Sequence, residues 1–278
     1  MTWTSPKVMG VLNVTPDSFS DGGQFLEISD ALAQANLLLA QGADIIDIGG
    51  ESTRPGAARV PADQEQQRVL PVIRAIRADR KFDGLQLSID TMNSSTAREA
   101  VLAGANIIND VSGGLADSNM FRVAAETGAQ IVISHWRGHS TSMDDLANYE
   151  DVARDVAAEI SEQISIARAN SVSPEKIIVD PGLGFAKNLT QNWELVARLN
   201  LIQDLGYPVL VGASRKRFIA GVLSEDLGSV STERRDLATA VLTALLLQRK
   251  LWGVRVHNVE ATRDAIRVVA ALRESDQS

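Results

Sequence analysis

Cysteine is absent from this chain of 278 residues. Without thiols the protein can form neither disulfides nor thiolate metal sites, and catalysis by a cysteine nucleophile is excluded. Long hydrophobic runs are absent too, because the longest uncharged apolar-rich stretch, residues 237–247, is about half as long as a membrane span. The N-terminus has no basic region followed by an apolar core, so we predict no secretory signal and a cytoplasmic protein.

Positive charge is in short supply, and the net charge at pH 7 is −8. This balance argues against nucleic acid or an anionic membrane as a partner, so an anionic ligand would need a local cluster of Arg and Lys. The chain also lacks a nucleophile elbow and a phosphate loop of the Walker type. Gly182 and Gly184 have no third glycine in register, which excludes a dinucleotide fingerprint.

A repeated local pattern runs along the chain: a short apolar run, a polar residue at its end, a loop and a helix. The clearest copy is Ile-Ile-Val-Asp at 177–180, followed by Pro181 and Gly182. Its length and β-branched composition are typical of a strand buried on both faces. We expect strands to end near residues 13, 48, 90, 109, 134, 180, 212 and 257. Helices are expected over 30–41, 62–80, 94–103, 119–127, 146–169, 191–205, 234–247 and 261–272.

The repeated units predict an α/β fold. Successive strand ends lie about 35 residues apart on average, which is the size of a βα unit. Eight parallel strands with intervening helices can close into a (β/α)₈ TIM barrel, and the alternative is an open doubly wound sheet built from the same units. Because the eight units fill nearly the whole chain, we predict a single barrel domain over residues 1–278.

Polar residues at the predicted strand ends mark the candidate site, because such barrels place their active sites at the C-terminal ends of the strands. Any one Asp or Asn before a helix can instead be a cap or a turn former. Asp90, Asn109 and Asp180 follow apolar runs directly, which favours the mouth of the barrel. Their hydrogen-bonding groups suit a flat heterocycle, and carboxylates suit a guanidine-like edge. The full set is Asn13, Asp47, Asp90, Asn109, Asp110, Ser134, His135, Asp180, Ser214, Lys216, Arg255 and His257.

A cationic run, Ser-Arg-Lys-Arg at 214–217, follows the seventh predicted strand, and Arg255 and His257 lie on the eighth. Loops after these two strands commonly bind phosphate in this fold. Three adjacent cations are usually a solvated surface run, but their place after Gly212 indicates a phosphate or diphosphate clamp, which Arg54 could join. His257 is expected to contact the ligand, whereas His135 can equally be a structural residue of its loop.

Seven motifs occur in order between residues 9 and 257: MGVLNVTPDSFSDG (9–22), GGESTRPG (49–56), IDT (89–91), NDVSGG (109–114), DPGLGFAK (180–187), VGASRK (211–216) and VRVH (254–257). Together they resemble the bacterial dihydropteroate synthases over nearly the whole chain. The resemblance implies a (β/α)₈ barrel and a homodimeric sulfonamide target that uses Mg²⁺. It also implies a reaction in which 4-aminobenzoate displaces diphosphate from 6-hydroxymethyl-7,8-dihydropterin diphosphate. In the family the C–O bond breaks first and leaves a cation delocalised over the pterin.

The resemblance also assigns roles to residues of the matching motifs. The catalytic residues would be Asp90, Lys216 and Arg255, with Asp90 placed to stabilise the pterin cation. The pterin would be held by Asp90, Asn109, Asp180, Lys216 and Arg255. The diphosphate would be held by Asn13, Arg54, Arg255 and His257, with Asn13 also binding Mg²⁺. The aminobenzoate would be surrounded by Phe19, Thr53, Pro55, Phe185, Ser214 and Lys216.

Two alternative functions remain open at this point. A pterin-binding methyltransferase of the corrinoid-dependent kind resembles this fold and shares Asp and Asn contacts to pterin. It releases no diphosphate, however, and so does not require the cationic clamp. A non-catalytic paralogue would bind pterin without turning it over. The intact Asn13, Asp90, Lys216 and Arg255 argue against the second alternative.

Two further features of the sequence predict mobility and assembly. Residues 14–23 and 52–59 are polar and rich in Gly, Pro and Ser, so we expect them to be poorly ordered covers over the site. The helix expected at 234–247 has apolar residues on more than one face, which predicts a homodimer through the last helices. These residues are Ala238, Val241, Leu242, Leu245 and Leu246.

Overall fold

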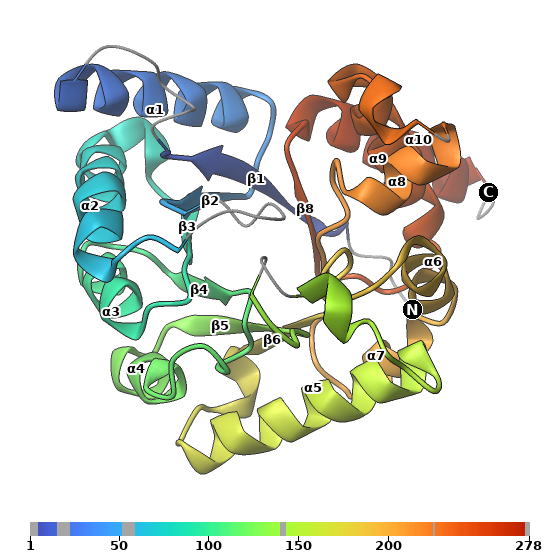
Figure 1. Ribbon diagram of the computed structural model, residues 1–278. Helices are drawn as coiled ribbons and strands as arrows, with labels where there is room; N and C mark the ends of the chain where they lie inside the picture. Colours follow the sequence, from blue (N-terminus) through green and yellow to red (C-terminus); the bar gives the residue numbers. More distant parts are fainter. Residues whose placement is uncertain (1–4, 16–22, 52–58, 140–142, 225, 276–278) are drawn as a thin grey trace.

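The computed structural model describes residues 5–15, 23–51, 59–139, 143–224 and 226–275. In these residues eight parallel strands form a ring with helices around its outside (Figure 1). The fold is therefore the predicted TIM barrel. Its strands are β1 (Lys7–Asn13), β2 (Ile45–Gly49), β3 (Gln86–Asp90), β4 (Ile107–Asp110), β5 (Gln130–Ser134), β6 (Ile177–Asp180), β7 (Leu210–Val211) and β8 (Gly253–Val256).

The ring closes between β6 and β7. The strand order is β6-β5-β4-β3-β2-β1-β8-β7, so only these two strands stand at the ends of the sheet. A single parallel bridge joins Val179 to Val209, and the N–H of Val179 donates to the carbonyl of Pro208 at 2.9 Å. This seam excludes the open doubly wound sheet.

The helices follow the predicted order, with differences in where several of them begin or break. The first helix begins at residue 23 instead of 30, and the one expected at 191–205 is broken near Arg198 into α6 and α7. An additional short helix, α8, starts at Arg217 inside the stretch that the sequence analysis treated as a cationic loop. The full set is α1 (Gly23–Ala40), α2 (Ala62–Ala78), α3 (Ser94–Leu102), α4 (Met120–Thr127), α5 (Val152–Ala169), α6 (Leu189–Ala197), α7 (Asn200–Gln203), α8 (Arg217–Leu223), α9 (Thr232–Leu246) and α10 (Val259–Ser275).

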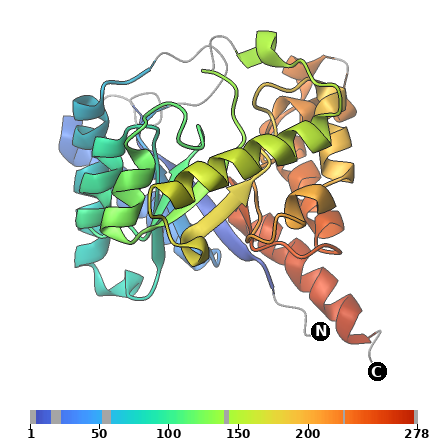
Figure 2. The same ribbon diagram turned by 90° about the horizontal axis from the view of Figure 1, so that it is seen from below.

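Helix α5 shows how local chemistry sets these boundaries. It was expected from residue 146 but begins at Val152, because the side chain of Asp151 caps it by accepting the N–H of Arg154 at 3.2 Å. The helix packs along the outside of β5, on the face seen in Figure 2. None of the helices in the described ranges combines the length and the apolar character needed to cross a bilayer.

The interior of the barrel changes character along its axis. Outward-facing strand residues such as Ile46, Ile48 and Ile89 pack under the helices in the main core. A separate interior cluster fills the base of the barrel with Met9, Ile45, Ile107, Val132, Ile178 and Leu210. One step further toward the strand ends, the buried residues at the corresponding strand positions are polar: Asp47, Asn109, Ser134 and Asp180. The barrel is therefore plugged at the base and polar at the mouth.

Candidate active site

The centre of the mouth is a guanidinium that bridges two carboxylates. Arg255 on β8 donates from Nε to Oδ2 of Asp47 and from Nη2 to Oδ2 of Asp90, both at 2.6 Å. Asn109 on β4 donates from Nδ2 to the same Asp47 oxygen at 3.0 Å. Side chains from β2, β3, β4 and β8 are thereby joined in one buried polar layer. Such charge-assisted contacts fix orientation as well as supplying energy.

Burial and charge act against each other in this layer. Burial lowers the pKa of Arg255, but the carboxylates of Asp47 and Asp90 outweigh burial and raise it above its ordinary value. Burial raises the pKa of Asp90 to about 7, against the opposing effect of Arg255 and with added repulsion from Asp47. The charge of Asp90 therefore responds to small changes in its surroundings near neutral pH.

The second half of the mouth is built on β6 and the loop after β7. Asp180 ends β6, and its Oδ1 accepts the N–H of Gly182 at 2.7 Å. A Cβ atom built at Gly212 would lie 3.4 Å from Oδ2 of Asp180 and 3.9 Å from Nζ of Lys216. The missing side chain at this position leaves space between the carboxylate and the ammonium.

Lys216 is held against the loop that follows β6. Its Nζ donates to the carbonyl of Leu183 and lies 4.5 Å from the ring centroid of Phe185. Burial lowers the pKa of Lys216 to about 8, partly offset by Asp180. Burial likewise raises the pKa of Asp180, with Lys216 opposing it. The two groups thus stabilise each other's charged form.

Two further predicted residues border this layer. Asn13 ends β1 beside Asp90: a Cβ built at Gly49 would lie 3.7 Å from Oδ1 of Asn13 and 3.6 Å from Oδ2 of Asp90. After β8, Nδ1 of His257 lies 3.0 Å from Oγ of Ser214. This contact joins the loops that follow β7 and β8, where the sequence predicted diphosphate and aminobenzoate contacts.

Not every residue of the predicted mouth faces it. Arg215 donates from Nε and Nη2 to the carboxylate of Asp236 on α9, at 2.7 and 2.8 Å. Arg217 begins α8 and is exposed. The prediction that three adjacent cations form one clamp was therefore wrong, and Lys216 is the member of the run that reaches the mouth. The run is divided because Arg215 pairs with Asp236 on α9 and Arg217 begins α8.

Asp110 is a turn former and no mouth ligand. One of its carboxylate oxygens accepts the N–H and the hydroxyl of Ser112 at 2.8 and 2.6 Å, and the other accepts the N–H of Gly114 at 2.7 Å. His135 also proves structural, as the second of its two sequence readings allowed, because it is buried against Glu159 and Lys187.

The predicted residues Phe19, Thr53, Arg54 and Pro55 lie outside the described residues. Most of the two predicted covers, residues 14–23 and 52–59, lies outside them as well.

Two buried charged residues have roles that the sequence did not predict, although Asp47 was counted among the polar residues at the strand ends. Asp47 is fully buried and holds Arg255, and its Oδ1 has no hydrogen-bond partner among the residues that the structure describes. A carboxylate interrupting the apolar run Ile-Ile-Asp-Ile was the available signal. Lys187 closes the DPGLGFAK motif and is only 6% exposed. Its spacing after Asp180 gave no sign that it would turn inward.

The site and fold define a class of protein. A family described as pterin-binding enzymes matches residues 9–257 of the chain, which belongs to that family. The dihydropteroate synthase of Mycobacterium leprae is 44% identical over 98% of this chain and 95% of its own length.

Solved structures of dihydropteroate synthases are also similar to this chain. The dihydropteroate synthase of Xanthomonas albilineans with 4-aminobenzoic acid superposes with a TM-score of 0.87 at 39% identity, covering 98% of this chain and 95% of that one. The same enzyme in complex with 7,8-dihydropteroate gives a TM-score of 0.85 at 36% identity, with the same coverage. Within the pterin-binding class the chain therefore belongs with the dihydropteroate synthases, which are transferases of folate biosynthesis, and the resemblance read from the seven motifs is confirmed.

Proposed function

We propose that the mouth of this barrel condenses 6-hydroxymethyl-7,8-dihydropterin diphosphate with 4-aminobenzoate to give 7,8-dihydropteroate and diphosphate. The observation that carries the proposal is the bridge from Asp47 through Arg255 to Asp90, with Asp180 and Lys216 in the same mouth. The complexes of the Xanthomonas enzyme with aminobenzoic acid and with dihydropteroate support it.

The pterin would be bound through its polar edge. Because Asn109 gives its amide N–H to Asp47, its carbonyl oxygen has a fixed direction in which to accept an N–H of the heterocycle. Asp180 supplies a second acceptor that is buried, and buried carboxylates pair well with an N–H beside an NH₂. Asp90 and Lys216 complete the set, with Lys216 also reaching the aminobenzoate.

Bond cleavage comes first in the proposed mechanism. The C–O bond to the diphosphate breaks, and the electron pair leaves with the diphosphate oxygen. The carboxylate of Asp90 stabilises the cation that is left on the pterin. Arg255 already gives Nε to Asp47 and Nη2 to Asp90, so it keeps Nη1 for the diphosphate and couples the two charges. Arg54 and His257 would hold the remaining oxygens.

Attack by the arylamine completes the reaction. The nitrogen lone pair of 4-aminobenzoate forms the new C–N bond, and the ammonium proton then leaves to solvent. An arylamine needs no general base to attack a carbocation, which agrees with a mouth of carboxylates held in ion pairs. Ser214, Phe185 and Lys216 would contact the aminobenzoate, together with Phe19, Thr53 and Pro55. A sulfonamide should compete for the same place.

Mg²⁺ fits the donors present. Among the described residues no three His, Cys, Asp or Glu side chains converge as metal ligands, and Asn13 offers a hard oxygen at the mouth. Mg²⁺ keeps several waters and binds through substrate phosphates, so one protein oxygen is a sufficient anchor. When bound, the ion would neutralise charge on the leaving diphosphate.

The proposal is tested by measuring diphosphate release and dihydropteroate formation together. With both substrates and Mg²⁺ the two products should form in equal amounts, and a sulfonamide should raise the KM for aminobenzoate without lowering kcat. Tight binding of the pterin diphosphate without diphosphate release would instead indicate a non-catalytic paralogue. Release of diphosphate would also distinguish this reaction from methyl transfer, which releases none.

We also propose that two copies associate through α9 and α10, which pack side by side (Figure 1). Leu242 and Leu246 are buried against the barrel, so they do not form a second apolar face. The exposed apolar residues of the two helices are Leu237, Val241, Leu245, Val268 and Leu272. Light scattering at micromolar concentration should give a dimer mass, and a Leu245→Glu, Val268→Glu variant should give a monomer. A monomer mass for the parent chain would overturn the proposal.

We place the reaction in the cytoplasm, where a cysteine-free enzyme needs no oxidising environment.

A further inference from the structure

The loop from β6 to α6, residues 181–187, has an unusual backbone. Gly182, Gly184 and Ala186 have φ angles of 64°, 80° and 46°. Ala186 carries a Cβ in a region that residues other than glycine rarely adopt. A Cβ at Gly182 would lie 2.1 Å from the carbonyl oxygen of His135, so the loop also passes very close to the end of β5. Such a backbone persists only where surrounding contacts hold it.

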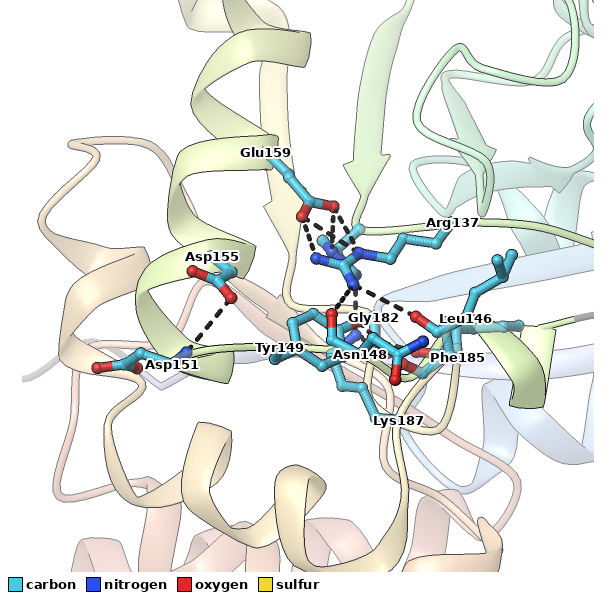
Figure 3. Close-up of polar contacts among 12 residues, drawn as sticks. Arg137, Leu146, Asn148, Tyr149, Asp151, Asp155, Glu159, Gly182, Phe185 and Lys187 are labelled. Carbon is cyan, nitrogen blue, oxygen red and sulfur yellow. Dashed lines mark hydrogen bonds and ion pairs between the residues drawn. The ribbon is translucent and has the colours of Figure 1, made fainter.

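Lys187 holds this loop from inside. Its Nζ lies 3.0 Å from the carbonyl oxygens of Gly182 and Phe185, which are labelled with it in Figure 3. The same Nζ lies 2.8 Å from Nδ1 of His135. These three acceptors match the three N–H donors of one ammonium group. Burial lowers the pKa of Lys187, and Asp180 opposes this effect.

His135 connects Lys187 to α5 through a second contact, with Glu159. Its Nε2 lies 2.9 Å from Oε2 of Glu159, so Nε2 carries the hydrogen and Nδ1 accepts from Lys187. Burial and Lys187 lower the pKa of His135 to about 4, which keeps the ring neutral. Burial would raise the pKa of Glu159, but hydrogen bonds from His135 and Arg137 outweigh it and lower the pKa to about 2. Glu159 is therefore negatively charged, and it is the last residue in the series of contacts that runs from Lys187 through His135.

Arg137 and Tyr149 connect Glu159 back to the loop at residues 181–187. Arg137 is paired with Glu159, and its guanidinium carbon lies 3.8 Å from the ring centroid of Tyr149 (Figure 3). The hydroxyl of Tyr149 donates to the carbonyl of Ala186 at 2.9 Å. The contacts thus start at Gly182 and Phe185 and return to Ala186, the residue with the least favourable backbone. They hold the loop through its backbone carbonyls.

On its other side the loop positions Lys216. The carbonyl of Leu183 accepts a hydrogen bond from Nζ, and the ring of Phe185 lies under the ammonium. A Cβ at Gly184 would lie 2.8 Å from Cδ of Lys216, so the lysine stem runs directly against the loop backbone. A shift of the loop must therefore move both Phe185 and the Lys216 ammonium.

We propose that Lys187 is a positioning residue for the aminobenzoate half of the reaction. Through Gly182, Phe185 and His135 it holds the loop in the one conformation that aligns Lys216 and Phe185. The inference rests on the proposed function, in which these two residues contact aminobenzoate. Lys187 itself touches no substrate. Of the proposed pterin contacts, those of Asp90, Asn109 and Arg255 come from other strands, whereas Asp180 and Lys216 also contact the loop.

The test is steady-state kinetics of Lys187→Met with both substrates varied. Methionine keeps much of the length and removes all three donors. Misplacement of a binding group by about 1 Å can cost up to 100-fold, so the KM for aminobenzoate should rise on the order of tenfold or more. The KM for the pterin diphosphate should rise less, because Asp90, Asn109 and Arg255 keep their places while Lys216 is the shared contact. The parent chain, assayed beside it, tests the proposed function separately, because that function fails only if the parent makes no dihydropteroate.

Arg77→Met is the matched control. Arg77 donates to the carbonyls of Gly104 and Leu85 and to Oδ1 of Asn106, at 2.9, 2.8 and 2.6 Å. It is thus a second cation holding three acceptors, but at the base of the barrel. Arg77→Met should lower Tm with both KM values unchanged. If Lys187→Met lowers Tm and changes the KM for aminobenzoate no more than Arg77→Met does, Lys187 is only structural and the proposal is overturned.

A pair of His135 variants decides the question if Lys187→Met does not fold. Asn at position 135 puts an acceptor near the place of Nδ1, whereas Leu removes it. His135→Asn should retain the parent KM for aminobenzoate, and His135→Leu should raise it as Lys187→Met would. Equal KM values in the two variants would contradict the proposal.

Discussion

The base and the mouth of this barrel are made by the same strands, two residues apart. Along β2, β4 and β6, Ile45, Ile107 and Ile178 belong to the apolar cluster at the base. The residues two positions later are Asp47, Asn109 and Asp180, all buried. Because side chains alternate between the two faces of a strand, both members of each pair point into the barrel interior. Three alternate strands therefore change from apolar to polar at the same height.

The difference separates stability from chemistry. Each fully buried isoleucine at the base contributes about 1.5–3 kcal/mol to folding. A buried carboxylate stabilises nothing unless it is paired, so the mouth relies on Arg255 and Lys216 to offset its desolvation. Substitutions at the base should therefore alter stability without altering the chemistry. Substitutions at the mouth should alter the chemistry, and they should also alter stability where they leave a carboxylate buried without its cation.

Arg255→Ala should have the largest effect, because it leaves Asp47 and Asp90 buried without their cation. The free energy of unfolding should fall by about 3–5 kcal/mol at pH 7. The folded-state pKa of Asp90, already above 3.8, should rise further, so the loss should shrink as pH falls toward 4. Denaturant unfolding at several pH values measures both. A loss that is the same at pH 7 and pH 4 would show that the carboxylates do not cause it.

Asp47→Asn should lower kcat/KM for the pterin diphosphate by about 10- to 100-fold, the value of one hydrogen bond to a charged group. The change keeps the shape but removes the charge that holds Nε of Arg255. Because Asp47 also raises the pKa of Asp90, that pKa should fall in the variant. Kinetics as a function of pH should show both effects, and Ser88→Ala on β3 is a buried control. Unchanged kcat/KM would mean that Arg255 is held by Asp90 alone.

The pH profile of kcat/KM should be a narrow bell. Asp90 must be ionised, so activity should fall about tenfold per unit as pH drops below its pKa of about 7. Lys216 must be protonated, so activity should fall again as pH rises through about 8. Asp90→Asn should lack the acid limb, and Lys216→Arg should lack the alkaline limb. Limbs that persist in both variants would belong to the substrates.

Ile107→Ala, at the base, should have the smallest effect on activity. Truncation should cost about 2–5 kcal/mol of stability because of the cavity that it leaves. Asn109, two residues later on the same strand, keeps its bond to Asp47 in this variant, so kcat and both KM values should stay close to those of the parent. Thermal unfolding and kinetics at a temperature below the lowered Tm check the two parts. A large fall in kcat would mean that base and mouth are coupled.

Strand ends were predicted well because most strands are apolar runs that stop at or beside a polar residue or a glycine. β6 ends at Asp180 and β3 at Asp90, as expected. Helix boundaries were less predictable where a cap or a break decided them, as with Asp151 before α5 and the division of α6 from α7. Propensity alone does not reveal which polar side chain will turn back onto the backbone.

The site was predictable as a set of residue types and not as a set of contacts. Asp90, Asn109, Asp180, Lys216 and Arg255 do meet at one mouth. The sequence could not show that Arg215 pairs with Asp236 from a helix 21 residues later. It could not show that Lys187 turns inward either, because that depends on acceptors from β5 and from its own loop. The contacts with Asp236 and His135 join residues far apart in the sequence, and a local pattern carries no information about them.

In the proposed mechanism the negative charge of Asp90 stabilises the cation that forms when the C–O bond breaks. Asp90→Asn keeps the shape and most hydrogen bonds and removes only that charge. A charge-assisted contact made in the transition state is worth roughly 2–4 kcal/mol, or about 30- to 1000-fold in rate. Steady-state kinetics with both substrates varied should therefore show kcat reduced by that factor with the KM for the pterin diphosphate nearly unchanged. A raised KM with an unchanged kcat would show that the charge serves binding alone, and would contradict the account.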